Sequence, residues 1–172
     1  MTPGSKSVGF PLDAVRDPPW PARAFARLSA PRTAPGLVVR AHRWVYRASG
    51  GRLGHGVFGA PVLLLHTTGR RSGKRRSTPL VYGADQGTLI VVASNRGGDQ
   101  APHWFKNQEA NPDVQVWIAR HKANGWARVI EPGATDFKRL WRLMDEVNFG
   151  RYGQLQAAST RPMPIVVISP AA

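Results

Sequence analysis

Short apolar segments separated by turn residues make up most of the chain after residue 60. We expect strands at 62–67, 78–83, 88–94, 113–119, 126–131 and 164–169. The fourth alternates clearly, because Val114, Val116 and Ile118 fall on one face. Gln86-Gly87 and Asn124-Gly125 predict tight turns before the third and fifth strands. Six strands with mostly short connections predict an antiparallel barrel or a curled sheet.

Two helices are expected between these strands. A short one covers 102–110 and ends at Asn111-Pro112, because proline disfavours helical backbone in the residue before it. A longer one covers 136–147, with Thr135 as its N-cap. Its apolar residues recur at helical spacing and predict a stripe that faces the core, namely Phe137, Leu140, Trp141, Met144 and Val147.

The first part of the chain has a different composition. Residues 1–36 are rich in Pro, Ala and Arg and predict an irregular arm with a short helix near 22–28. Residues 37–49 predict an amphipathic helix, and the glycine-rich residues 51–60 predict a flexible link. This helix either packs on the domain or lies on anionic lipid, to which Trp44 and Tyr46 are suited. The sequence thus predicts an arm at 1–36 and one domain at 37–172.

The chain is strongly basic, with 24 Lys and Arg against 10 Asp and Glu and a net charge of +14. Such a charge indicates an anionic partner: nucleic acid, anionic lipid or a polyanionic small molecule. Nucleic acid is disfavoured, because the aromatic residues do not alternate with the basic ones as they do in stacking platforms. The five His residues have no metal-binding spacing and cysteine is absent, so no metal site is expected.

The sequence also bears on the compartment and the class of chemistry. No apolar run approaches the roughly 20 residues of a transmembrane helix, and the N-terminal residues lack a signal-peptide pattern. We therefore expect a cytoplasmic protein, peripheral on the inner face of the plasma membrane if the helix at 37–49 binds lipid. Motifs for serine hydrolases, P-loops and Rossmann sites are absent. An enzyme of this kind would depend on a bound cofactor.

A loop dense in cations and hydroxyl groups joins the first two strands. The stretch 65–80 reads LHTTGRRSGKRRSTPL and carries five cations, Arg70, Arg71, Lys74, Arg75 and Arg76. Guanidinium groups bind phosphate or carboxylate through paired hydrogen bonds, and glycines let backbone N–H groups approach the same oxygens. The loop therefore predicts an anion-binding site.

Two further segments follow the third strand. The polar stretch ASNRGG at 93–98 would share one rim with the cationic loop if the first strand pairs beside the third; otherwise it is a separate surface loop. His103, Trp104 and Phe105 begin the short helix. Their rings either stack on a flat ligand or pack in the core.

Together these segments resemble the deazaflavin-dependent nitroreductase family, also described as coenzyme F420-dependent quinone reductases. The family combines a strand followed by a glycine- and arginine-rich segment that ends in [TS]PL, the segments VVAS and GG, the segment PxW[YF]xNxxANP and a tail ending IPVVVL; the corresponding segments here are 67–80, 91–94 with 97–98, 102–112 and 163–168. The resemblance implies a mainly β fold with flanking helices, a split β-barrel like that of FMN-binding pyridoxamine phosphate oxidases, often a homodimer. It implies binding of F420, whose tail is polyanionic. It also implies hydride transfer from reduced F420 to a quinone, an enone or another activated alkene, or a nitroaromatic compound.

The resemblance further implies the residues of the site. Arg71, Ser72 and Arg76 would meet the phosphate and carboxylates, 78–81 would line the ring and ribityl chain, and Ser94 and Tyr152 would donate hydrogen bonds to the reduced acceptor. The full set implied to bind the cofactor is Arg70, Arg71, Ser72, Arg76, Ser77, Thr78, Pro79, Leu80, Val81, Val92, Ala93, Ser94, Asn95, His103, Trp104, Phe105, Lys106 and Asn107.

The chain departs from the family pattern in three places, one of which is Arg96, an extra charge inserted in the SxGG region. Phe105 stands where relatives often carry Tyr, and Leu155 replaces the second tyrosine of a YxxYQ motif that Tyr152 begins. The alternatives are a barrel that binds FMN in the same groove and a barrel that carries a cofactor or lipid without catalysis. The cations between Arg70 and Arg76 favour F420, because a polyglutamate tail needs a longer cationic track than FMN does.

Overall fold

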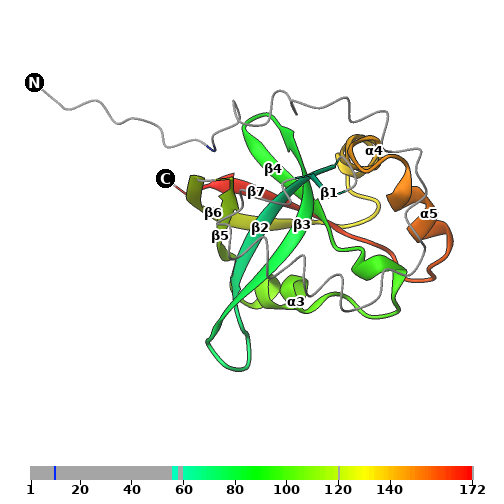
Figure 1. Cartoon of the computed structure of the whole chain (residues 1–172). Coiled ribbons are helices and arrows are strands. Elements are labelled where there is room, and N and C mark those ends of the chain that lie inside the picture. Colours follow the sequence, from blue (N-terminus) through cyan, green and yellow to red (C-terminus); the bar gives the residue numbers. More distant parts are fainter. Residues whose placement is uncertain (1–9, 11–55, 58–59, 120, 172) are drawn as a thin grey trace, which may run out of the picture.

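The computed structural model describes residue 10 and residues 56–57, 60–119 and 121–171, which are arranged around a β-barrel (Figure 1). The strands are β1 (Gly56–Val57), β2 (Ala60–Thr68), β3 (Arg75–Asp85), β4 (Thr88–Val92), β5 (Asp113–Ile118), β6 (His121–Ile130) and β7 (Ile165–Pro170). The helices are the 3-10 helix η2 (Asn95–Gly97), α3 (His103–Ala110), α4 (Phe137–Val147) and α5 (Arg151–Ala157). The expected fold class, a mainly β split barrel with flanking helices, is confirmed.

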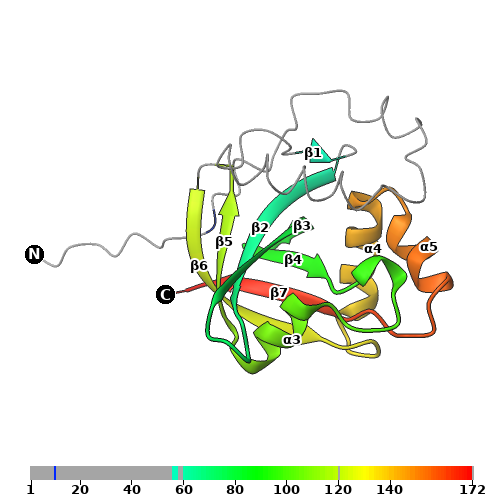
Figure 2. The same ribbon diagram turned by 60° about the horizontal axis from the view of Figure 1, so that its bottom comes forward.

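Neighbouring strands are antiparallel and follow the order β1-β2-β3-β4-β7-β6-β5. The barrel closes because β2 also pairs with β5, through Leu64↔Trp117, Leu65↔Val116 and His66↔Gln115. The β2–β3 hairpin projects beyond the barrel, and α3 lies near its base (Figures 1 and 2). Helices α4 and α5 lie together on another side of the barrel (Figure 2).

Two hydrophobic clusters hold these layers together. The barrel cluster consists of Phe10, Leu63, Leu65, Tyr82, Leu89, Val91, Ala93, Trp104, Phe105, Val114, Val116, Ile118, Ala127, Val166 and Ile168. The helix cluster consists of Ile90, Val92, Ile130, Leu140, Met144, Tyr152, Met163, Ile165 and Val167. Alternate residues of β4 and β7 belong to different clusters, so both faces of these strands are buried. This explains why their sequences are continuous apolar runs.

The predicted stripe of α4 faces the helix cluster, with Leu140 and Met144 buried. The helix approaches β3 closely at Gly83, because a Cβ added there would lie 2.6 Å from Cδ2 of Leu143 and 2.8 Å from Sδ of Met144. Glycine is therefore required at this point of β3 for packing and not for a turn.

The predicted strands are present, but several ends differ. β3 begins at Arg75, three positions before the predicted start, so part of the cationic segment is strand. The turn predicted at Asn124-Gly125 is wrong, since both residues lie inside β6. The hairpin turns between Ile118 and His121, with Ala119 at a φ of 51°. Gly125 allows close packing instead, because an added Cβ would lie 2.8 Å from Cγ2 of Ile168.

Within the described residues, both predicted helices are present within a residue of the predicted bounds, but η2 and α5 were not predicted. α3 begins at His103 and ends at Ala110. α4 begins at Phe137, and Asp136 rather than Thr135 is its N-cap. α5 was not predicted, because its short segment has few apolar residues and contains Gly153.

Several sequence predictions lie outside the described residues: the arm at 1–36 apart from Phe10, the helices at 22–28 and 37–49, and most of the link at 51–60. Phe10 is buried in the barrel cluster. Within the link, Gly56–Val57 pairs with β2 and forms β1. In the part of the chain that the structure describes, no helix has the length and apolar character to cross a membrane.

Gly83→Ala is expected to destabilise the fold by about 1–3 kcal/mol, because the added methyl group overpacks the contact with α4. Urea unfolding monitored by tryptophan fluorescence measures this change. Ser169→Ala, at an exposed position of β7, is the control and should stay within about 0.5 kcal/mol of the unaltered chain. Equal stability of Gly83→Ala and the control would contradict the packing argument.

Candidate functional site

The β3 strand is longer than its neighbour β4, which leaves half of one edge open. β2 pairs with β3 from Val62↔Val81 to Thr68↔Arg75. β4 pairs only with the other half, from Tyr82↔Val91 to Asp85↔Thr88. Among the described residues, no strand pairs with 75–81 on the edge opposite β2. Unpaired backbone groups on this edge are available to a ligand.

The loop that ends this hairpin is a compact turn. The Gly69 N–H donates to O of Lys74 at 2.9 Å, and the Gly73 N–H donates to O of Gly69 at 2.8 Å. Gly73 has a φ of 63°, which favours glycine. The Lys74 N–H approaches Oγ of Ser72 at 3.4 Å. The loop therefore holds its cations on a defined backbone.

The strand register separates the two cations that lie in β3, Arg75 and Arg76. Arg75 and Arg76 are adjacent in β3, so their side chains point to opposite faces. Nε of Arg75 donates to Nδ1 of His66 at 3.0 Å, Nη2 donates to Oε1 of Gln115, and the guanidinium lies 5.3 Å from the ring centroid of Trp117. Arg75 is thus occupied by structural contacts.

The face toward α3 carries Arg70, which is fixed by Asn107. The N–H and Nη1 of Arg70 donate to Oδ1 of Asn107 at 3.2 and 3.4 Å. Nδ2 of Asn107 donates in turn to Oγ1 of Thr67 at 3.3 Å. Thr67 is the register partner of Arg76, so Arg76 projects on this same face. The buried amide of Asn107 therefore ties the hairpin to α3.

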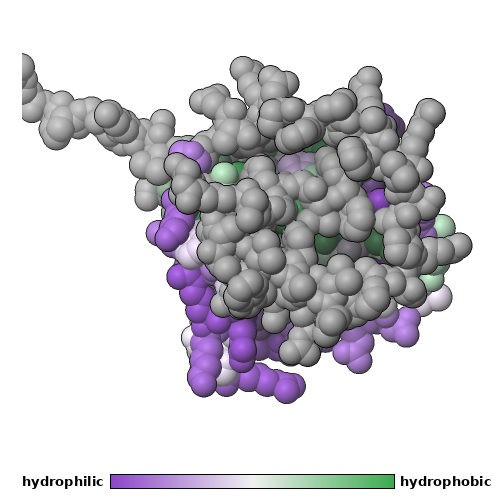
Figure 3. Space-filling view, in the orientation of Figure 1, coloured by the Kyte–Doolittle hydropathy of each residue, from purple (hydrophilic) through white to green (hydrophobic). Residues whose placement is uncertain are grey.

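Three cations of the loop remain uncommitted. Arg71, Lys74 and Arg76 are exposed, and their side chains have no hydrogen bond or ion pair within the described part of the chain. Figure 3 shows the hydrophilic residues gathered at the projecting end of the hairpin. Unpaired guanidinium and ammonium groups that are close together attract a polyanionic group.

The predicted residues of β3 lie along the open edge. Thr78 and Leu80 alternate with Ser77, Pro79 and Val81, and all five are half-buried. Oγ of Ser77 lies 2.8 Å from Nδ1 of His66, so Ser77 belongs to the same face as Arg75. Thr78 and Leu80 share the face of Arg76, and Leu80 packs against the barrel cluster.

The segment after β4 begins where β3 loses its partner. Val91 is opposite Tyr82, so Val92 follows at the start of the open edge. Val92 and Ala93 are buried, Ser94 is half-buried, and Asn95 is exposed with Nδ2 donating to O of Gln100 at 2.8 Å.

The cationic loop and the stretch 93–98 were expected to share one rim if β2 paired beside β4. This pairing is not present, because β3 lies between β2 and β4 in the sheet. β2 and β4 are nevertheless both antiparallel to β3, so they run in the same direction. The loops that follow them therefore leave the same end of the barrel.

The aromatic residues of α3 lie inside the barrel. Trp104 and Phe105 are each 5% exposed, and their ring centroids are 6.0 Å apart in an edge-to-face contact. His103 is exposed and Lys106 is half-buried. Of the two alternatives for these rings, core packing is the one observed.

Tyr152 lies on α5 in the helix cluster, and its ring is 6.3 Å from that of Trp141. Burial raises the pKa of its hydroxyl above the ordinary value of 10. This shift reflects the apolar surroundings of the hydroxyl, which disfavour the charged phenolate. Leu155, one turn later, is half-buried and packs against the same cluster.

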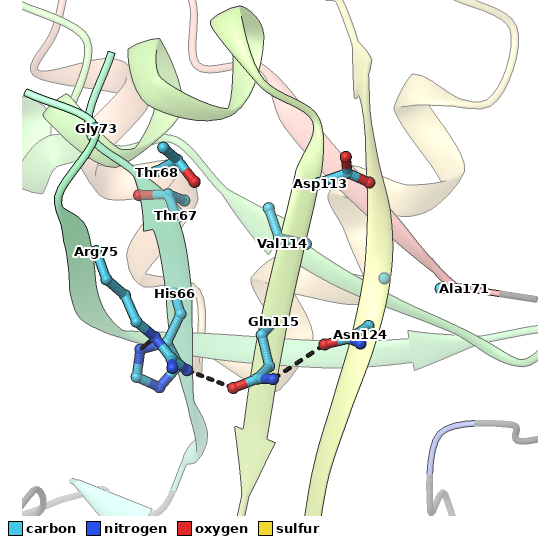
Figure 4. A pocket seen from close by; sticks show the side chains of 11 residues that line it. His66, Thr67, Thr68, Gly73, Arg75, Asp113, Val114, Gln115, Asn124 and Ala171 are labelled. Atoms are coloured by element: carbon cyan, nitrogen blue, oxygen red, sulfur yellow. Dashed lines mark hydrogen bonds between the residues drawn. The ribbon is translucent and has the colours of Figure 1, made fainter. Parts of the chain in front are cut away.

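A separate cavity of about 460 Å³ lies between the β2–β3 hairpin and the β5–β6 hairpin (Figure 4). Its polar groups bind one another: Arg75 donates to Gln115, and Nε2 of Gln115 donates to Oδ1 of Asn124 at 3.0 Å. None of the predicted site residues lines it. We place the candidate site at the open edge of β3 instead, because the uncommitted cations are there.

Sequence reasoning missed one polar side chain next to the site. Arg161, in the connection between α5 and β7, donates hydrogen bonds to backbone carbonyls at 93–98. No motif identifies this residue, because its partners are backbone atoms distant in sequence. The described residues contain no group of side chains that could hold a metal ion.

Comparison with known proteins identifies the family. The family model described as F420H(2)-dependent quinone reductase matches residues 38–170. The F420H(2)-dependent quinone reductase Rv1261c of Mycobacterium tuberculosis is 38% identical over 133 residues, covering 77% of this chain and 89% of the relative.

Solved structures agree with this result. The F420-H2 dependent reductase FDR-A superposes with a TM-score of 0.56 at 31% identity, covering 63% of this chain and 93% of that one. A chain described as a domain-swapped dimer gives 0.57 at 29% identity, covering 74% and 98%. The chain described here belongs to the F420H(2)-dependent quinone reductase family.

Proposed function

We propose that this chain is an F420-dependent oxidoreductase that transfers a hydride from reduced F420 to a quinone. The observation that carries the proposal is the set of exposed, uncommitted cations Arg71, Lys74 and Arg76 beside the open edge of β3. This donor set fits the phosphate and carboxylates of the F420 tail. Membership of the family supports the same cofactor.

Different residues of the site bind different parts of F420. Arg71, Ser72 and Arg76 hold the anionic tail, while Asn107 keeps Arg70 and the hairpin in place. Residues 77–81 and 92–95 line the ring and ribityl chain, with hydroxyl groups from Thr78 and Ser94, since the hydroxyl of Ser77 is bonded to His66. His103, Trp104, Phe105 and Lys106 close the site from the side of α3, where the buried rings form a rigid wall.

Reduced F420 supplies the hydride, so the chain itself needs to orient both reactants and stabilise charge. Ser94, which is half-buried beside the open edge, donates a hydrogen bond to the oxygen of the acceptor as it gains electrons, whereas Tyr152 is buried in the helix cluster and supports the site by packing.

Quinones are the proposed acceptors, in accord with the family description. Nitroaromatic compounds and activated alkenes are further candidates on the same chemistry, since both accept a hydride at an electron-poor atom. Phe105 offers no hydroxyl group, so hydrogen bonding to a nitro group depends on other donors.

Binding and turnover together test this function. Fluorescence titration should show that the purified chain binds F420 in preference to FMN, and absorbance should show oxidation of reduced F420 when a quinone is added. Nitroaromatics and enones are screened in parallel, and a DNA duplex serves as a control for general affinity for polyanions. FMN binding without F420 binding would contradict the proposal. Sedimentation of the same sample tests the homodimer that the domain-swapped neighbour suggests.

Arg71→Ala and Arg76→Ala should each weaken F420 binding by about 1.5–3 kcal/mol, because each removes a charged hydrogen bond to the tail. Titration measures the effect, and higher salt should reduce the difference. Arg142→Ala is the matched control, since Arg142 is an exposed cation on α4, on another side of the barrel. If all three variants bind equally well, the tail is not held by this loop.

We also propose that residues 37–49 attach the chain to anionic membranes, which would bring it close to lipid-soluble quinones. Replacing Arg40, Arg43 and Arg47 with Gln should lower binding to vesicles that contain phosphatidylserine, as each cation contributes about 1 kcal/mol near such a surface. Co-sedimentation with vesicles measures this. Substitution is preferable to deletion of the N-terminal residues, because deletion also removes Phe10 from the barrel cluster. Unchanged vesicle binding would remove the membrane proposal.

A further inference from the structure

The connection between β4 and α3 contains an unusual run of backbone conformations. Asn95 and Arg96 have φ values of 45° and 56°, and Gly97 follows at 81°. Left-handed backbone is uncommon for residues with a side chain and persists where the surrounding structure imposes it. Within the loop, the Gly97 N–H donates to O of Ser94 at 2.9 Å and the Gly98 N–H donates to O of Asn95 at 3.0 Å. A restraint from outside the loop would add to these bonds.

Arg161 provides this restraint. Its Nη2 donates to O of Ala93 and to O of Ser94, both at 3.0 Å, and its Nε donates to O of Gly98 at 3.3 Å. These carbonyls lie before and after the left-handed residues. One planar guanidinium group thus joins the start of the loop to its end.

Arg161 is itself held by its own connection. Its Nη1 donates to O of Pro162 at 3.0 Å, and Nε2 of Gln156 donates to O of Arg161 at 3.1 Å. In the reverse direction, the Ala93 N–H donates to O of Pro164 at 2.9 Å. Each of the two segments, the α5–β7 connection and the loop, therefore both donates hydrogen bonds to the other and accepts them from it.

The hydrogen bonds from Arg161 also fix the direction of two backbone N–H groups in the loop. The peptide bonds of the described residues are trans, so each C=O points opposite to the N–H of the same peptide unit. Because the carbonyls of Ala93 and Ser94 point at Arg161, the N–H groups of Ser94 and Asn95 point away from it. A cation on the carbonyl side also polarises these peptides and strengthens them as donors.

We propose that Arg161 is a positioning residue, which holds the loop at 93–98 in the conformation that presents Ser94 and Asn95 to F420. The inference rests on the proposed function, since it assigns a role toward the same cofactor. Arg161 acts through the backbone of the loop and does not contact the cofactor. Its contribution is preorganisation, because a loop fixed before binding does not have to be ordered by the ligand.

The test compares Arg161→Ala, Arg161→Lys and the charge-matched control Arg142→Ala. If the loop conformation falls to about a tenth of the population in Arg161→Ala, the apparent Kd for F420 rises about tenfold. Arg161→Lys keeps the charge and can reach part of the carbonyl set, so an intermediate Kd is expected. NMR couplings between the amide and α protons of Asn95 and Arg96 report their positive φ without any cofactor and should change in Arg161→Ala.

The outcomes separate this inference from the proposed function. Failure of the unaltered chain to bind F420 would overturn the proposed function, and the NMR measurement would then decide on its own whether Arg161 holds the loop. A folded Arg161→Ala variant with Kd within about twofold of the unaltered chain would overturn the inference, as would an equal loss in Arg142→Ala. If Arg161→Ala does not fold, Arg161→Lys decides: an unchanged Kd contradicts the proposal.

Discussion

The mismatch in length between β3 and β4 is the constraint on which the site depends. The pairing of β4 with β3 ends at Tyr82, whereas β3 begins seven positions earlier in the chain, at Arg75, and is paired there with β2. The hairpin therefore projects from the barrel with one open edge, and the chain leaving β4 passes through η2 before it reaches α3. A closed barrel alone offers no free backbone, so this opening is what gives the fold room for a ligand.

Because side chains alternate along β3, Arg75 and Arg76 lie on opposite faces of the hairpin and make different contacts. Arg75 faces His66, Gln115 and Trp117 and stabilises the side of the hairpin next to β5. Arg76 projects on the other face, where Arg70 is fixed by Asn107. A basic loop that looks uniform in sequence is thus part structural and part available to a ligand, since adjacent strand residues point in opposite directions.

Polar side chains that bond to backbone atoms connect the pieces of the site. Asn107 joins α3 to the hairpin, and Arg161 joins the α5–β7 connection to the loop after β4. Both residues satisfy groups that would otherwise need water, in places where hydrophobic packing does not reach. They let loops carry the binding groups while the two hydrophobic clusters supply the stability.

The hydrophobic pattern predicted the strands, the stripe of α4 and the mainly β class, because strands buried on both faces read as short apolar runs and strands or helices buried on one face read as periodic ones. The order of the cationic, polar and aromatic motifs indicated the family. Asn124-Gly125 was misplaced as a turn, because glycine serves both tight turns and close packing, and only the contact with Ile168 distinguishes them. The division of the cations, the open edge of β3 and the bonds of Arg161 were decided by the tertiary structure, since each depends on strand register or on backbone atoms far apart in the chain.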